Sequence, residues 1–265
     1  MPEGDTIYQT AAALRPLLVG QPILAAKART PGPAIHRVVG ARVTSIEPLG
    51  KHMLIRFDNG LALHTHLRMG GTWHRYAPGE RWKMPAWRAR VVLEVPEHVV
   101  VCFNAPVAEL MEDRAVELHP ALLSLGPDLA RNVFDSDEAF RRLRARPDLE
   151  IAEALLDQRV MAGIGNVFKC EALWWLRLDP WLPPAQLDDG RLGELYATAR
   201  KFMRANRTGF GRRFPYGDAA VHGRAGRPCR RCSTLLEARA QGEQARTTYY
   251  CGACQKGPEG TPPPS

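Results

Sequence analysis

The chain has 265 residues, of which 45% are apolar, so it can bury the cores of two modest domains or one large one. Its 36 Lys and Arg outnumber 28 Asp and Glu and give a formal charge of +8, which favours a polyanionic partner. No apolar run is long enough for a membrane span, and the N-terminus lacks a basic-then-apolar signal pattern. These features argue against a membrane protein or a secreted one.

The first half predicts one helix followed by β structure. Asp5 and Thr6, either of which can cap a helix, precede apolar residues at helical spacing: Ile7, Ala11, Leu14 and Leu18. Runs of β-forming residues at 52–57 and 61–67 then flank an Asp-Asn-Gly turn, and runs at 88–95 and 98–103 flank a Pro-Glu turn. We therefore expect an α+β protein whose N-terminal domain, residues 1–118, is an antiparallel β-sandwich or barrel with one helix.

The second half predicts helices. Pro120, Gly126 and Pro127 break regular structure and indicate a linker over 119–132. Apolar residues three or four apart then predict helices at 136–146, 149–158, 166–178 and 191–207. We place a helical domain at 133–221, a basic, cysteine-rich finger at 222–257 and a disordered tail at 258–265.

The finger carries two matched pairs of cysteines separated by eighteen residues: Cys229, Cys232, Cys251 and Cys254. Four thiolates at this spacing can converge tetrahedrally, and strands at 235–237 and 247–250 would make a zinc hairpin. The alternative is free thiols. A closed four-cysteine shell leaves no position for substrate, so we expect one structural Zn²⁺. Cys102 and Cys170 are isolated and are expected to be buried thiols.

Two further features point to nucleic acid. From His222 to Lys256 the chain holds seven Lys or Arg against two Glu, with stackable faces at Tyr249 and Tyr250, which fits a nucleic-acid groove as well as a solvated basic face. Upstream, Ala162-Gly-Ile-Gly-Asn166 joins two helical stretches, so Asn166 can cap the second helix and its N-terminus can bind phosphate. A plain helix connector is equally compatible with the spacing.

Four segments, in order, resemble the formamidopyrimidine-DNA glycosylase and endonuclease VIII family. They are the N-terminal MPEG, the Gly-Lys-His turn at 50–52, ALLDQRVMAGIGN at 154–166 followed by EAL at 171–173, and the final RTTYYC-x2-CQ at 246–255. The third segment resembles the family's helix-two-turn-helix and the fourth its zinc finger. The resemblance covers residues 1 to about 256. It implies a bacterial base-excision-repair enzyme, a bifunctional glycosylase and abasic-site lyase that acts as a cytoplasmic, nucleoid-associated monomer on damaged DNA.

Two details favour the endonuclease VIII branch, which implies oxidised pyrimidines as substrates. Gly4 follows Glu3, where the formamidopyrimidine branch usually has leucine. That branch also carries an Arg-Arg-Phe-Gly loop after a strand, whereas this chain reads FNAPVAEL at 103–110, so the lesion-side loop is expected to be missing.

The resemblance also assigns the chemistry. Once Met1 is removed, Pro2 presents a secondary amine that can attack the sugar C1′ and form a Schiff base, because α-amino groups titrate near neutrality. Glu3 matches the acid that assists sugar-ring opening. Lys51 matches the residue of β-elimination, and Arg246 matches the finger arginine of δ-elimination and phosphate binding. The alternatives are an ordinary chain start for Pro2 and Glu3 and an ordinary surface lysine for Lys51.

DNA contacts follow from the same resemblance. Asn166 matches a phosphate-contacting asparagine, and His66 falls where a phosphate-contacting histidine lies, although a structural histidine fits equally well. Met69, with Arg68, is the candidate wedge that fills the gap left by a flipped base, from an expected hairpin tip before Gly70. The alternative for Met69 is a core methionine.

The chain departs from the family at Thr6, where a glutamate is common near the nucleophile. Either Asp5 substitutes for it or the proton relay differs. Two other classes compete with an enzyme: a non-catalytic damaged-DNA binder of the same fold, and a ribosomal or polymerase-associated zinc module. The retained Pro2, Glu3 and Lys51 argue against the first, and the N-terminus argues against the second.

Overall fold

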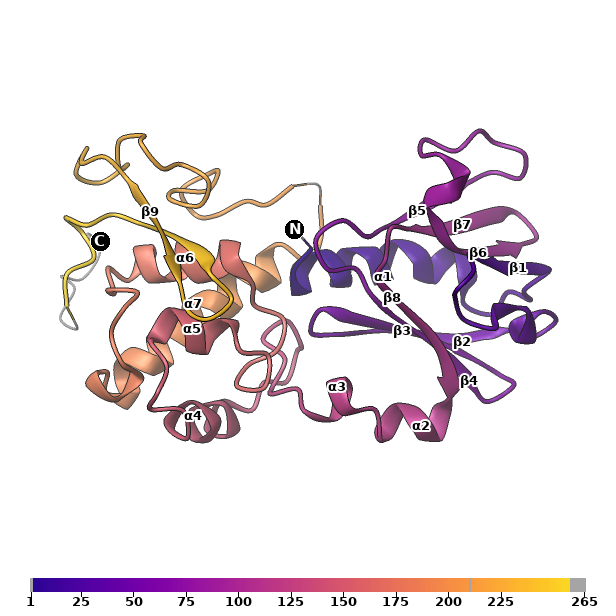
Figure 1. Ribbon diagram of the computed structural model, residues 1–265, viewed down its shortest axis with the longest axis horizontal. Helices are drawn as coiled ribbons and strands as arrows, with labels where there is room; N and C mark the ends of the chain where they lie inside the picture. The colour runs from indigo at the N-terminus through magenta and orange to yellow at the C-terminus, as the bar shows by residue number, and fades with distance from the viewer. Residues whose placement is uncertain (1, 210, 258–265) are drawn as a thin grey trace. The chain divides into compact units, whose positions relative to one another are not determined.

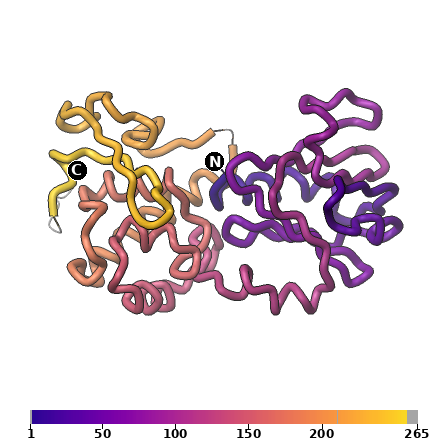
Figure 2. The backbone as a smooth tube through the Cα atoms, in the orientation of Figure 1, coloured from indigo at the N-terminus to yellow at the C-terminus, as the bar shows by residue number. Residues whose placement is uncertain are grey.

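The computed structural model describes residues 2–209 and 211–257, so the predicted tail at 258–265 lies outside the described residues (Figure 2). The chain falls into two compact units that divide between Leu123 and Ser124. Within the described ranges, none of the helices combines the length and apolar character needed to cross a membrane.

The N-terminal unit is built on two four-stranded antiparallel sheets (Figure 1). One has the strand order β1-β6-β7-β5, with β1 at Ala25–Ala28, β6 at Ala89–Val95, β7 at His98–Phe103 and β5 at Thr72–Tyr76. The other has the order β2-β3-β4-β8, with β2 at Val43–Leu49, β3 at His52–Phe57, β4 at Leu61–His66 and β8 at Val107–Glu112. Both predicted hairpins are present, and the predicted antiparallel sandwich is confirmed.

Helix α1, Gly4–Leu18, packs on β2 and β3 and buries the four predicted apolar residues. The expected cap at Asp5 or Thr6 is wrong: Glu3 is the N-cap, because its backbone is extended and its carbonyl accepts the first helical hydrogen bond, from Ile7 N at 3.2 Å. Asp5 lies instead in the first turn, where its charge complements the positive end of the helix.

Alternation along the strands divides the β2-β3-β4-β8 sheet into two faces. Met53, Ile55 and Phe57 of β3 join the core that the unit shares with α1, together with Leu61 and Leu63 of β4. The intervening side chains occupy the other face, and three of them are histidines: His52, His64 and His66.

Short helices complete this unit: η1 at Ile35–Val38, η2 at Ala86–Arg88, α2 at Asp113–Glu117 and α3 at Pro120–Leu123. Part of the predicted linker is therefore helical. Pro120 begins α3 rather than breaking structure, since proline is tolerated at the first helical position.

The C-terminal unit contains the four predicted helices and a two-stranded hairpin (Figure 1). The helices are α4 at Ser136–Arg144, α5 at Ile151–Leu156, α6 at Asn166–Trp175 and α7 at Asp189–Ala205, with η3 at Pro184–Gln186. The hairpin pairs β9, Glu237–Gln241, with β10, Arg246–Tyr250. The four helices confirm the predicted helical domain, and the hairpin together with the four-cysteine cluster confirms the predicted finger hairpin.

Two local predictions in this unit were wrong. Asn166 does not cap α6; the N-cap is Gly165, whose extended backbone places its carbonyl to accept from Lys169 N at 3.0 Å. The first finger strand begins at Glu237 rather than at Leu235, because Leu236 N is already bonded to the Arg227 carbonyl at 2.9 Å.

Candidate functional site

The predicted nucleophile stands directly before two buried carboxylates. Pro2 is half-buried, whereas Glu3 and Asp5 are buried at the start of α1. Thr6 donates from Oγ1 to Asp5 Oδ1 at 3.2 Å, so the residue that replaces the expected glutamate supports Asp5. The first turn of α1 thus keeps acidic groups next to the N-terminal residue.

Lys51 occupies the two-residue turn between β2 and β3, as predicted. Leu49 pairs with His52 across the turn, and Gly50 has φ +57, a conformation that favours glycine. Such a turn fixes the backbone of Lys51 within one residue of the sheet.

His66 ends β4 and lies opposite His52. Burial lowers the pKa of His66 to about 4, and the positive charges of Arg68 and Lys51 act in the same direction. Its Nδ1 accepts a hydrogen bond from Arg68 N at 3.2 Å. The neutral ring therefore carries its proton on Nε2, which makes that nitrogen a donor.

The predicted wedge lies on a tight turn after His66. Met69 is 65% exposed, which excludes the core-methionine alternative. Arg68 has φ +45, and Gly71 N closes the turn on the Leu67 carbonyl at 2.8 Å. The expected hairpin tip was wrong, because β4 and β5 belong to different sheets and this turn is the connection between them.

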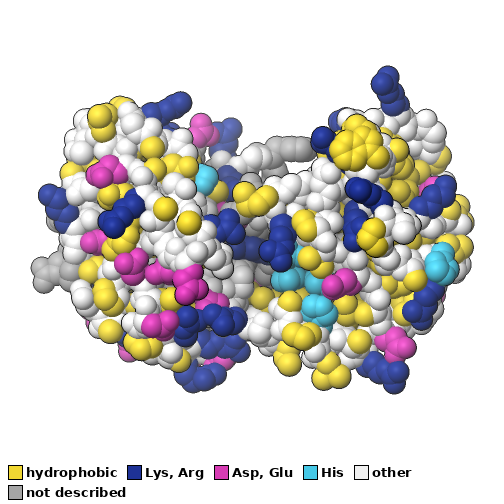
Figure 3. Space-filling model, viewed as in Figure 1, with side chains coloured by type: hydrophobic (Ala, Val, Ile, Leu, Met, Phe, Trp, Pro, Cys, Tyr) yellow, Lys and Arg dark blue, Asp and Glu magenta, His cyan; other side chains and the backbone are white. Residues whose placement is uncertain are grey.

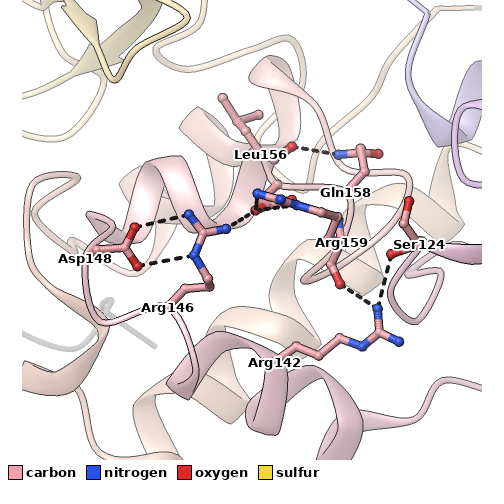
Figure 4. Close-up of polar contacts among 8 residues, drawn as sticks. Ser124, Arg142, Arg146, Asp148, Leu156, Gln158 and Arg159 are labelled. Carbon is pink, nitrogen blue, oxygen red and sulfur yellow. Dashed lines mark hydrogen bonds and ion pairs between the residues drawn. The ribbon is translucent and has the colours of Figure 1, made fainter. Parts of the chain in front are cut away.

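The turn between α5 and α6 is organised by Gln158, which sequence reasoning missed (Figure 4). Its Nε2 donates to the carbonyls of Leu156 at 2.9 Å and Ile164 at 3.0 Å, and its Oε1 accepts from Gly163 N at 3.0 Å. One side chain thus supplies the polar partners of the glycine turn. The sequence signal that could have identified Gln158 is the presence of an amide side chain five positions before Gly163.

An ion-pair network supports the same turn (Figure 4). Asp157 Oδ2 lies 2.7 Å from Arg146 Nη1 and 2.7 Å from Arg159 Nη2. Burial raises the pKa of Asp157, but the hydrogen bonds and charge of Arg159, with the charge of Arg146, outweigh it and hold that pKa below its ordinary value. Arg142 Nη1 donates to the Arg159 carbonyl at 2.8 Å.

Asn166 links the first turn of α6 to the finger. Its Nδ2 donates to the Thr247 carbonyl at 2.8 Å, and Thr247 follows Arg246 on β10. Its Oδ1 is buried and has no hydrogen-bond partner among the described residues. The structure thus brings Asn166 next to the strand that begins with Arg246.

Buried polar groups join the finger to α6. The Glu171 carboxylate is fully buried and accepts four hydrogen bonds of 2.7–3.0 Å from the segment that leads into the finger: Tyr216 Oη, Ala220 N, Val221 N and His222 N. Lys169, also buried, donates to Thr248 Oγ1 at 2.7 Å. Neither residue could be given this role from the sequence, because the partners of Glu171 lie 45 to 51 positions away and that of Lys169 lies 79 positions away, so there is no local signal.

The four finger cysteines converge. Their Sγ atoms lie within 4.8 Å of one another, and the separations include 3.5 Å for Cys232–Cys251 and 3.9 Å for Cys229–Cys254. Tetrahedral Zn–S bonds of about 2.3 Å place sulfurs about 3.8 Å apart. The cluster therefore fits one zinc ion with no position left for substrate. Neither Cys102 nor Cys170 belongs to this group of four. Both are buried as predicted, Cys102 in the core of the N-terminal unit and Cys170 in the apolar cluster that also contains Cys229 and Cys251.

Comparison with known proteins decides the family. Residues 1–107 match the formamidopyrimidine-DNA glycosylase N-terminal domain, and residues 125–209 match the H2TH domain of the same enzymes. The chain belongs to the formamidopyrimidine-DNA glycosylase family. It is accordingly a DNA glycosylase and abasic-site lyase of base-excision repair.

Relatives within the family carry endonuclease 8 names. "Probable endonuclease 8 2" of Streptomyces coelicolor is 41% identical, over 99% of this chain and 96% of that protein. "DNA-(apurinic or apyrimidinic site) lyase Nei2" of Mycolicibacterium smegmatis is 37% identical, over 96% of this chain and 99% of its own length. These names confirm the predicted resemblance to the endonuclease VIII branch.

Solved structures of the family share the fold. The Lactococcus lactis glycosylase in complex with DNA containing N7-benzyl-Fapy-dG has a TM-score of 0.82 at 20% identity and covers 96% of this chain and 100% of its own. The glycosylase MutM in complex with DNA containing carbocyclic 8-oxo-G has a TM-score of 0.84, also at 20% identity, with the same coverage.

Proposed function

We propose that this glycosylase removes oxidised pyrimidines through a Schiff base on Pro2 and then cleaves the strand by β,δ-elimination. The observation that carries the proposal is the start of α1, where Pro2 precedes two buried carboxylates in a chain of the endonuclease 8 type. A non-catalytic DNA binder would need neither the amine nor the acids.

Base removal begins with the Pro2 amine. After Met1 is removed, the neutral nitrogen attacks C1′ of the damaged nucleoside, the bond from C1′ to the base breaks, and the proton of the amine leaves with the departing base. Glu3 delivers a proton to O4′, so the sugar ring opens and the nitrogen–carbon pair becomes an iminium. The N-cap position of Glu3, buried and adjacent to Pro2, suits a carboxyl that must act on the same sugar.

Strand cleavage follows from the iminium, which acidifies C2′. Loss of the C2′ proton expels the 3′ phosphate in β-elimination, and loss of the C4′ proton then expels the 5′ phosphate in δ-elimination. We assign Lys51, held by its two-residue turn, to the first step and Arg246, at the start of β10, to the second. The forked donors of a guanidinium match a departing phosphate.

DNA is held by groups on both units. We assign phosphate contacts to the Asn166 end of α6, where the helix dipole is positive, and to His66 through its Nε2 proton. Met69, exposed on its turn, is the wedge that fills the space of the flipped base, and Arg68 accompanies it. The four cysteines would hold one structural zinc ion, which fixes the hairpin that carries Arg246.

The proposed preference for oxidised pyrimidines rests on the resemblance to the endonuclease VIII branch and on the short link between β7 and β8. Strand β7 ends at Phe103 and β8 begins at Val107, so residues 104–106 form the whole link, where the formamidopyrimidine branch has its Arg-Arg-Phe-Gly loop. Asn104 turns there with φ +51. An enzyme without that loop is expected to prefer pyrimidine lesions.

A panel of duplex oligonucleotides, each with one defined lesion, tests this assignment. We expect excision of oxidised pyrimidines and cleavage of abasic sites to exceed excision of 8-oxoguanine, with 3′-phosphate ends as the product of δ-elimination. In Arg246→Ala the δ-elimination step should be slowed, so the product of β-elimination, which still carries the sugar remnant at its 3′ end, should accumulate. A clear preference for 8-oxoguanine would contradict the lesion class, and an absence of cleavage at abasic sites would contradict the enzyme mechanism.

A further inference from the structure

The outer face of the β3-β4-β8 sheet carries a cluster that the lyase mechanism does not use. His64 on β4 lies directly opposite Glu109 on β8, and His119, between α2 and α3, packs its ring against His64 with centroids 5.0 Å apart. Figure 3 shows a group of histidine side chains on the surface of the N-terminal unit. All three residues belong to that unit, away from the finger cysteines in the chain.

One carboxylate oxygen joins the two rings. Glu109 Oε2 lies 3.0 Å from His64 Nδ1 and 3.2 Å from His119 Nε2, and a ligand atom from each residue falls within 4.8 Å of the other two. Zinc bonds of about 2.0–2.2 Å to nitrogen and oxygen place ligands roughly 3.3–3.5 Å apart in a tetrahedron. The two measured separations are close to that spacing, so an ion needs only a small outward shift of the ligands.

We propose that His64, Glu109 and His119 form a second metal site, which binds one divalent transition ion such as Zn²⁺. Two imidazoles and one carboxylate are the ligand set that such ions prefer over Mg²⁺ or Ca²⁺, which favour oxygen. Glu109 is 48% exposed and His119 21% exposed, so an ion has a path from solvent and a coordination position open to water.

The surroundings fit metal ligation. His64 is 1% exposed, and its Nε2 lies 2.8 Å from His52 Nδ1, the kind of partner that orients a ligating imidazole through its other nitrogen. His119 Nδ1 is buried with no hydrogen-bond partner among the described residues, so no donor occupies its lone pair and the ring proton can reside there while Nε2 binds metal. Both histidines can thus present a lone pair to the ion.

Metal titration of the full-length protein with its finger already loaded with zinc tests the site. Isothermal titration with Zn²⁺, together with metal analysis after dialysis, should show one further equivalent per chain in the wild type. Glu109→Ala and His119→Ala should weaken that second binding at least about tenfold, because each removes one of three ligands. Both residues are partly exposed, so folding should survive, and circular dichroism checks it.

Two measurements keep the outcome specific. His36→Ala, at an exposed histidine in η1, should bind the second equivalent like the wild type. Co²⁺ bound second should show weak ligand-field bands without the strong thiolate charge-transfer band that cysteine ligands give. If the wild type takes up only the finger ion, or if both alanine variants bind the second ion within twofold of the wild type, the proposal is wrong.

Discussion

The side-chain amide of Asn166 donates a 2.8 Å hydrogen bond to the backbone carbonyl of Thr247. This contact joins the first residue of α6 to the finger strand one residue beyond Arg246. The N-terminal end of α6 and Arg246, which we assign to phosphate binding, are therefore linked by this one hydrogen bond. A change at Asn166 is expected to affect both.

Asn166→Asp is expected to weaken DNA binding. The substitution replaces the amide donor with a carboxylate oxygen that faces the Thr247 carbonyl, and it adds a negative charge where phosphate should bind. We expect a loss of about 1–3 kcal/mol, or roughly one to two orders of magnitude in Kd. Fluorescence anisotropy with a duplex that contains a stable abasic-site analogue measures this loss.

Asn59→Asp is the matched control for Asn166→Asp, because the Asn59 side chain also donates to a backbone carbonyl, that of Arg37, on an exposed turn. Equal losses in both variants would argue against a local role.

Glu171→Gln is expected to destabilise the C-terminal unit. The carboxylate is fully buried and accepts from the N–H groups of Ala220, Val221 and His222. A glutamine side chain turns one acceptor into a donor that faces another donor, at a cost of about 2–4 kcal/mol in the free energy of unfolding. Urea unfolding measures it. Glu243→Gln, at an exposed position of the finger, should change little, and a near-zero effect of Glu171→Gln would show that the contacts are not stabilising.

Asp157→Asn is expected to lower stability in a pH-dependent way. The native pKa of Asp157 lies below the ordinary value of 3.8, so its stabilisation is present above that pH and disappears as the pH falls through the native pKa. The difference in unfolding free energy between wild type and variant should be about 1–2 kcal/mol at pH 7 and should shrink below pH 3.8. Thermal unfolding across pH measures it. Asp148→Asn, at an exposed ion pair with Arg146, should have little effect; a pH-independent Asp157 difference would contradict the assignment.

Much of this architecture is readable from local pattern. Runs of β-forming residues around turn signals predicted the sandwich, and two Cys-x2-Cys pairs predicted the cluster, because both are closely spaced signals. The supports of the site are not local. Glu171 meets Val221 fifty positions away, and Lys169 meets Thr248 seventy-nine positions away. A charged residue in a sequence normally predicts a solvent-exposed side chain, so only the fold reveals that Glu171 and Lys169 are buried. The histidine cluster is hidden in the same way, since Glu109 and His64 become neighbours only through strand pairing.

Met69→Ala is expected to separate base excision from strand cleavage. The exposed side chain is assigned to the gap that a flipped base leaves, so its loss should slow excision of an oxidised pyrimidine from duplex DNA by about tenfold. Cleavage at an abasic site, which has no base to extrude, should fall much less. Single-turnover assays on both substrates measure the ratio. Val133→Ala truncates another exposed apolar side chain and should leave both rates unchanged. Equal slowing of both reactions by Met69→Ala would argue against a wedge.

The central claim is that Pro2 is the nucleophile. Borohydride reduction during reaction with abasic-site DNA should trap a covalent complex, and mass spectrometry of its peptides should place the sugar remnant on the Pro2 nitrogen of a chain that lacks Met1. A remnant on a lysine side chain, or full activity in protein that retains Met1, would contradict the account.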